Sequence, residues 1–249
     1  MRLIASCLTL LILASTPACS LKRAAVNRLG DALAEGTGTY AADDDPELVR
    51  DASPFALKTL EALLETSPKH PGLLLAAASG FTQYAHAFLQ DEADYTEARD
   101  LARATELRAR ARKMYLRARG YGLRGLEVAL PGFGEGLRTD PAAALARAGQ
   151  AQVPLLYYTA ASWAAAFALD ITDPTLAVGQ GTIEQMARRA LALDPAWDGG
   201  ALGEFLLAWE AGHAGAGGSK AEARRLFEEV VSPLAKKVHG VSAVSANAE

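Results

Sequence analysis

Apolar residues recur at helical spacing in segments that proline and glycine separate, and this pattern constrains the fold more than any other feature. One such segment opens at Ser53-Pro54, which has the residues of a helix cap followed by proline in the first turn, and it ends at Ser67-Pro68. Its apolar residues are Phe55, Leu57, Leu60, Leu63 and Leu64. No segment requires the alternating pattern of a half-buried strand. The sequence therefore predicts an all-α fold.

Further segments of the same kind predict the other helices. These helices are expected at residues 21–35, 72–91, 95–119, 141–149, 153–169, 182–193, 199–212 and 220–231. A glycine-rich run at 120–127 is predicted to be a turn region that ends at 131–134. Asp43, Asp44 and Asp45 lack the spaced ligands and central glycine of a calcium loop, so we expect them at a helix N-terminus, where the helix dipole favours acids.

The composition supports helices and argues against a nucleic-acid partner. Half of the residues are apolar and only 7% are aromatic, which suits close-packed helices better than sheets. The formal net charge is −4, so the chain as a whole lacks the excess of basic residues that binds a phosphate backbone.

The N-terminus has the layout of a secretory signal. Met1-Arg2 precedes an apolar run at 3–14, which is too short for a stable membrane span, and the chain's two cysteines are Cys7 and Cys19. Cys19 follows a small residue at the end of this segment, as in a bacterial lipobox, although Thr16 stands where leucine is usual. We predict that Cys19 is lipidated and anchors the protein to the outer membrane. Ordinary secretion and an uncleaved anchor are the alternatives.

Four regions follow from these observations. We expect a signal peptide at 1–18, the anchor cysteine with an N-terminal helix at 19–42, a helical domain at 43–232, and a tail at 233–249 without a clear period.

Helical hairpins joined by proline-marked turns raise the question of a tetratricopeptide repeat. The second-helix offsets of that pattern occur at Ala56, Leu60, Leu63 and Pro68, and again at Ala111, Tyr115 and Ala118 and at Ala223, Phe227 and Val230. A poorer match occurs at Ala187, Ala190 and Pro195. The positions that correspond to the large residue of the pattern are 60, 115, 187 and 227, so they do not keep a 34-residue period. We predict hairpins stacked as a degenerate tetratricopeptide-like solenoid, with a generic helical bundle as the alternative.

Known catalytic and metal-binding patterns are missing from the sequence. The four histidines, His70, His86, His213 and His239, form no pair at metal-ligand spacing, and no cysteine follows Cys19. Phosphate-binding, dinucleotide-binding and nucleophile-elbow motifs are also absent. We therefore expect neither an enzyme nor a cofactor or a metal.

Aromatic residues with polar tips gather near the glycine-rich run and in the apolar segment at 153–169. The candidates for ligand binding or for lining a pore are Tyr84, Tyr115, Arg119, Tyr121, Arg124, Glu127, Tyr157, Tyr158, Trp163 and Trp209, with Trp197 close to the last of them. Arg119 and Arg124 could hold a ligand carboxylate with two hydrogen bonds each. In the alternative interpretation, Arg124 pairs with Glu127 and the aromatic rings belong to the core.

Three strings of sequence resemble the TatT family, the lipoproteins associated with TRAP transporters. The longest runs from Tyr115 to Glu127 and contains Tyr-Gly-Leu-Arg-Gly-Leu-Glu; the others are 75–85 and 157–163, and the similarity covers roughly 43–231. The resemblance implies a periplasm-facing lipoprotein built of tetratricopeptide-like helical pairs, which assembles as a homo-trimer. It also implies docking of a TRAP-type substrate-binding protein and a pore or groove for a small hydrophobic ligand. Family members usually continue with further helices beyond the segment that matches 241–249, so the resemblance also predicts a shortened C-terminus.

Two functions from different classes follow. The first is a lipid-anchored accessory protein of a TRAP-type transport system, which binds a substrate-binding protein and a small organic acid or hydrophobic ligand. The second is a structural scaffold for envelope assembly with no small-molecule ligand. An enzyme with a dispersed site is a distant third.

Overall fold

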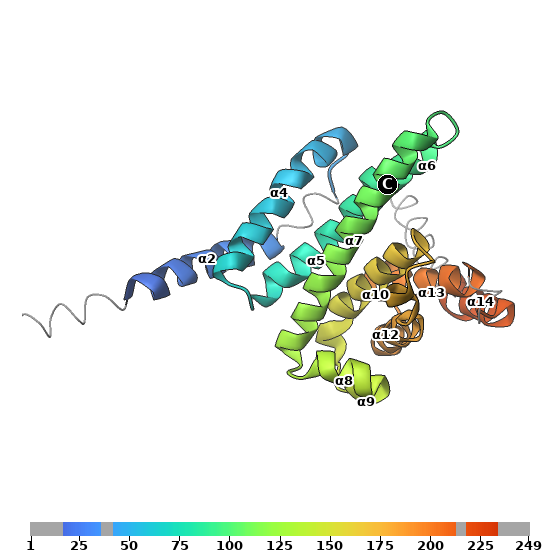
Figure 1. The fold of residues 1–249 in the computed structure, drawn as a ribbon. Coiled ribbons are helices and arrows are strands. Elements are labelled where there is room, and N and C mark those ends of the chain that lie inside the picture. Colours follow the sequence, from blue (N-terminus) through green and yellow to red (C-terminus); the bar gives the residue numbers. More distant parts are fainter. Residues whose placement is uncertain (1–16, 36–41, 213–217, 234–249) are drawn as a thin grey trace, which may run out of the picture. The chain divides into compact units, whose positions relative to one another are not determined.

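The computed structural model describes residues 17–35, 42–212 and 218–233. Most of the predicted signal peptide and nearly all of the predicted tail therefore lie outside the described residues. The chain divides into two compact units, Met1–Ala77 and Ala78–Glu249. Every regular element of the described residues is a helix, which confirms the all-α prediction (Figure 1).

The first unit contains α2 (Pro17–Glu35), α4 (Pro46–Thr66) and the start of α5 (Pro71–Ala85). The carboxylate of Asp45 accepts hydrogen bonds from the backbone N–H groups of Glu47 and Leu48, both at 3.0 Å, and so caps α4. The predicted helix start at Ser53-Pro54 is wrong, because Pro54 lies inside α4. The Ser53 hydroxyl donates to the Val49 carbonyl at 2.6 Å instead of capping a helix.

A buried histidine connects α2 to the start of α5. The His70 Nδ1 accepts a hydrogen bond from the Leu73 N–H at 3.2 Å, and its Nε2 lies 3.1 Å from the Asn27 carbonyl. Since Nδ1 is the acceptor, Nε2 carries the proton and donates. The Gly30 backbone packs closely on Leu73: a Cβ at this glycine would lie 3.0 Å from the leucine side chain. The predicted helix at 21–35 is confirmed as part of α2.

The second unit begins within α5 and contains the remaining helices. They are η1 (His86–Gln90), α6 (Asp91–Thr96), α7 (Leu101–Ala129), α8 (Phe133–Thr139), α9 (Pro141–Ala146), η2 (Gln150–Gln152), α10 (Val153–Ala168), α11 (Pro174–Ala177), α12 (Gln180–Leu193), η3 (Trp197–Gly200), α13 (Ala201–Gly212), α14 (Lys220–Leu226) and η4 (Phe227–Val231). Helices α7, α10, α12, α13 and α14 pack against one another in this order (Figure 1).

The glycine-rich run is helical, so the prediction of a turn region at 120–127 is wrong. Helix α7 continues to Ala129 because the glycines allow α10 to approach it closely. A Cβ at Gly122 would lie 2.1 Å from the Thr159 Oγ1, and a Cβ at Gly125 would lie 2.7 Å from the Leu155 side chain. Tight interhelical packing therefore offsets the poor helix propensity of glycine.

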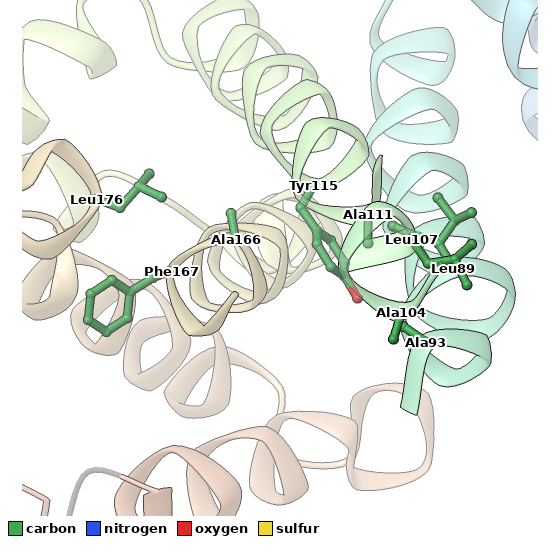
Figure 2. Close-up of a cluster of buried hydrophobic side chains, with 10 residues drawn as sticks. Leu89, Ala93, Ala104, Leu107, Ala111, Tyr115, Ala166, Phe167 and Leu176 are labelled. Carbon is green, nitrogen blue, oxygen red and sulfur yellow. The ribbon is translucent and has the colours of Figure 1, made fainter. Parts of the chain in front are cut away.

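A core of small and apolar side chains joins α6, α7, α10 and α11. Figure 2 shows the ring of Tyr115 in this cluster, between the α10 residue Ala166 and the leucines Leu89 and Leu107. The turn η1 has the wide π-helical form, and Ala85, Leu89 and Ala93 are buried at intervals of four residues across it. This spacing keeps α6 in contact with α7.

Ion pairs hold the last helices together. Arg188 on α12 donates to Glu184 at 2.7 Å, to Glu210 at 2.5 Å and to Glu222 at 2.9 Å. Glu210 is buried, and its second oxygen accepts from the Ser219 N–H at 2.8 Å. One guanidinium thus connects α12, α13 and α14. In the part of the chain that the structure describes, no helix is both long and apolar enough to cross a membrane.

Candidate functional site

A cluster of aromatic rings joins α10, η3 and α13. Tyr157 lies 4.7 Å from Trp197 and 6.3 Å from Phe205, and Phe205 stacks on Trp209 at 6.2 Å, measured between ring centroids. Tyr158 meets Trp197 edge-on at 6.0 Å. All of these rings except the buried Trp209 keep part of their surface exposed. We name these five residues the aromatic cluster.

A left-handed turn positions Trp197 in the aromatic cluster. Asp198, Gly199 and Gly200 have φ angles of 47°, 67° and 104°, so three consecutive residues occupy a region that favours glycine. Among the described residues, Asp198 is the one that has a positive φ without being a glycine, and it directly follows Trp197. Strained backbone of this kind persists only where the surrounding packing holds it in place.

The two tyrosines present polar groups to the exposed side of the aromatic cluster. The Tyr158 hydroxyl accepts a hydrogen bond from the Gln83 side chain at 3.4 Å. Burial, reinforced by the nearby Asp198 carboxylate, raises the pKa of Tyr158 to about 12, and the same causes raise the pKa of Tyr157. Both phenols therefore stay protonated at neutral pH and can donate hydrogen bonds to a ligand.

An arginine stacks on the tryptophan of α10. The Arg119 Cζ lies 4.3 Å from the centroid of the Trp163 ring, and both side chains are half-buried. Burial lowers the pKa of Arg119, and the Asp173 carboxylate opposes this effect. Among the described residues, the buried indole nitrogen of Trp163 has no hydrogen-bond partner. Gly179 makes room for this ring, since a Cβ there would lie 1.9 Å from it.

The second predicted arginine stacks on a different ring. The Arg124 Cζ lies 5.4 Å from the Tyr121 centroid, and Tyr121 stacks on Phe81 at 5.8 Å. Arg119 and Arg124 thus contact separate aromatic rings, and the structure does not bring their guanidinium groups to one ring.

Three other predicted residues have contacts that stabilise the fold. The Tyr115 ring is buried in the core, and its hydroxyl donates to the Gln90 side chain at 2.7 Å. Tyr84 packs against this core and against Phe88, with ring centroids 5.7 Å apart. The Glu127 carboxylate accepts the N–H groups that follow α7, from Gly132 at 2.7 Å and Gly134 at 2.9 Å, and these bonds lower its pKa.

Sequence reasoning missed two residues near the aromatic rings. Phe205 joins Tyr157 to Trp209, and its spacing of four residues from Trp209 on a helix is the signal that could have revealed it. Gln83 comes from a helix remote in sequence, and no local pattern pairs it with Tyr158. No cluster of three or more metal-binding side chains occurs in the described ranges.

Comparisons with known proteins show the family to which the chain is similar. A family model described as TRAP transporter T-component matches residues 42–247. The chain is also 33% identical, over 233 residues, to a protein of Treponema pallidum (strain Nichols) described as uncharacterized. This similarity covers 85% of the chain and 72% of the relative.

Proposed function

Because this chain belongs to the family of TRAP transporter T-components, we propose that it is an accessory protein that docks the substrate-binding protein of a TRAP-type system and receives a small organic ligand on its aromatic cluster. The observation that carries the ligand proposal is the set of part-exposed rings from Tyr157, Tyr158, Trp197 and Phe205. The faces of such rings suit the apolar part of a ligand, and tyrosine hydroxyls suit its polar end.

The arginines favour a ligand with a carboxylate. Arg119 is half-buried and stacks on Trp163, which keeps the guanidinium plane fixed while its edge stays able to donate paired hydrogen bonds. Trp163 lies six residues beyond Tyr157 on α10 and therefore on another face of that helix, so Arg119 and the aromatic cluster are two separate candidate contacts for a small organic acid with an apolar body.

Anchoring and assembly complete the proposal. We propose that Cys19 is lipidated, that the mature protein faces the periplasm at the outer membrane, and that three copies associate. The order in which α7, α10, α12, α13 and α14 pack supports stacked tetratricopeptide-like hairpins.

Tryptophan fluorescence tests the ligand proposal directly. Two of the chain's three tryptophans, Trp197 and Trp209, belong to the aromatic cluster. Addition of benzoate or octanoate should change the emission of the wild-type chain. Tyr157→Leu should abolish the change, whereas Tyr95→Leu, at an exposed position on α6, should not. Identical titrations of both variants would refute binding at the aromatic cluster.

Native mass spectrometry of a chain of residues 20–249, expressed in the source cells without the anchor cysteine and extracted gently, tests assembly and retained ligand together. A trimer that carries an organic acid or lipid supports the transport function. An empty chain that also fails to bind the substrate-binding protein in isothermal titration calorimetry favours the scaffold function. In that case, replacement of Arg119, Tyr121 or Arg124 would change stability without changing uptake.

A further inference from the structure

Helix α2 leads directly from the predicted anchor residue into the fold. Cys19 lies in the first turn of α2. Eight residues later, the Asn27 side-chain oxygen accepts a hydrogen bond from the Ser67 hydroxyl at 2.6 Å, and the Asn27 carbonyl accepts one from the His70 Nε2 at 3.1 Å. A helix rises 1.5 Å per residue, so about 12 Å separates the anchor residue from these contacts. A helix, and not an extended linker, therefore connects Cys19 to the first unit.

One face of α2 packs on the first unit. Val26 and Asn27 are half-buried and Gly30 is buried, and they lie within about 100° of the helix circumference. The opposite side carries five exposed residues within about 120° of the circumference, and we name them the outward face of α2: Lys22, Ala25, Arg28, Leu29 and Ala32. Contacts with Ser67 and Leu73 thus fix which side of α2 is turned away from its unit.

The outward face is an apolar strip bordered by cations. Ala25, Leu29 and Ala32 occupy the middle of the face, and Leu29 is 50% exposed. Lys22 lies at one edge of the face and Arg28 at the other. Such a helix suits the interface of a membrane, where the apolar strip meets acyl chains and the cations reach lipid phosphates.

The positive charge at this end of α2 is not balanced within the first unit. Lys22, Arg23 and Arg28 all precede the first acid of the helix, Asp31. Asp31 itself lies 3.2 Å from the His70 Nε2. Among the described residues, no carboxylate lies within ion-pair distance of the three cations. This end of the helix therefore has a positive potential that favours an anionic surface.

The position of the anchor residue indicates what covers the outward face. Acyl chains on Cys19 would place a lipid surface about one helical turn from Lys22. Because these chains would already hold the helix at the surface, a weak attraction is enough to keep the outward face in contact with it. Three cations near an anionic lipid surface favour contact about 100-fold. A soluble partner lacks the advantage of the covalent anchor.

We propose that the outward face of α2 lies on the anionic lipid surface in which Cys19 is anchored, an inference that rests on the lipidation in the proposed function. Asn27 and His70 join α2 to the start of α5, so the first unit is then held against the membrane in one orientation. A flexible tether would instead let the unit rotate freely.

Fluorescence quenching in vesicles tests the position of α2. Signal cleavage removes Cys7 and acylation blocks Cys19, so Ala25→Cys supplies the only thiol for a bimane label. The acylated chain is reconstituted in vesicles of phosphatidylethanolamine and phosphatidylglycerol that contain a lipid with a nitroxide headgroup. We expect the nitroxide to quench at least half of the bimane emission.

Reversal of two cations tests the charge. Lys22→Glu/Arg28→Glu in the labelled chain should lower the quenching at least twofold, and so should vesicles of pure phosphatidylcholine. Lys69→Glu/Lys220→Glu changes the net charge equally at exposed sites outside α2 and should leave the quenching unchanged. Circular dichroism establishes that both double variants fold.

The outcomes separate this inference from the lipidation on which it rests. A mature chain that shows no acyl chains in mass spectrometry would overturn both. An acylated chain whose label escapes quenching, or is quenched equally in the two double variants, would overturn the inference and leave the lipidation intact. Disulfide-linked dimers through Ala25→Cys, without quenching, would assign the outward face to a second copy of the chain and would also overturn the inference.

Discussion

The guanidinium of Arg119 lies face-on to the ring of Trp163, with 4.3 Å between the Cζ and the ring centroid. The pair connects α7 to α10 at a half-buried position, where a cation stacked on a ring gains more than it does in water. It therefore contributes to stability as well as being a candidate for ligand binding.

Removal of this guanidinium should weaken the fold. We expect Arg119→Met, which keeps an unbranched stem, to lower the free energy of unfolding by about 0.5–2 kcal/mol in urea titrations. Arg117→Met removes an exposed guanidinium that lies farther from its ring, at 5.8 Å, and should cost less. An equal loss for the two variants would contradict the special role of the Trp163 contact.

Two neighbouring glycines of α7 should respond in opposite directions to alanine. Gly122→Ala places a Cβ against Thr159 and should destabilise the protein by about 1–3 kcal/mol. Gly120→Ala meets open space and should stabilise the helix by about 0.5–1 kcal/mol. Thermal unfolding of both variants measures the difference. Thr159→Ala should relieve part of the Gly122→Ala loss in the double variant; simple additivity would argue against the contact.

The ion pairs around Glu222 predict a defined acid sensitivity. Hydrogen bonds from Arg225 and Arg188 lower the pKa of Glu222 to about 2, from an ordinary value of 4.5. A lowered carboxyl pKa means that the stabilisation is complete above pH 4.5 and is lost as the pH falls towards 2. The urea midpoint of Glu222→Gln should therefore be below that of wild type at pH 7, and the gap should close by about pH 2. Glu65→Gln, at an exposed position on α4, should show no such gap.

The left-handed turn at the aromatic cluster predicts a purely conformational effect. Gly199 has a φ of 67° and open space around a Cβ, so Gly199→Ala should destabilise through backbone strain alone, by about 1–2 kcal/mol. Displacement of the adjacent Trp197 should also shift the fluorescence emission. Gly212→Ala has equally open surroundings without a positive φ and serves as the control. The strain argument fails if the two variants unfold at the same urea concentration.

Local patterns predicted most helices, but they failed where a distant partner decides the conformation. The glycines at 122 and 125 indicated a turn in the sequence, yet they are helical because Thr159 and Leu155 approach them from α10. Pro54 indicated a helix start, whereas the cap that begins α4 belongs to Asp45. The acids at 43–45 were placed correctly, because a cap depends only on its immediate neighbours.

The sequence predicted which residues are candidates for the site better than it predicted which of them lie together. The sequence identified Tyr157, Tyr158 and Trp209, and the structure brings them together through Phe205 and Trp197. It also identified Tyr115, whose hydroxyl has a partner in Gln90 inside the core. Both cases depend on contacts between helices that sequence spacing does not reveal.

The wide turn η1 makes this stretch of the chain tolerant of one deletion. A π turn closes through i→i+5 hydrogen bonds and holds one residue more than an α turn, so deletion of one residue from His86–Gln90 would restore α-helical bonding with little rotation of the residues that follow. A second deletion would instead rotate those residues by about 100° and shift them by about 1.5 Å along the axis, and Ala93 would then leave the core that Leu89 and Ala85 define. The π turn therefore holds one spare residue that the chain can lose without loss of alignment.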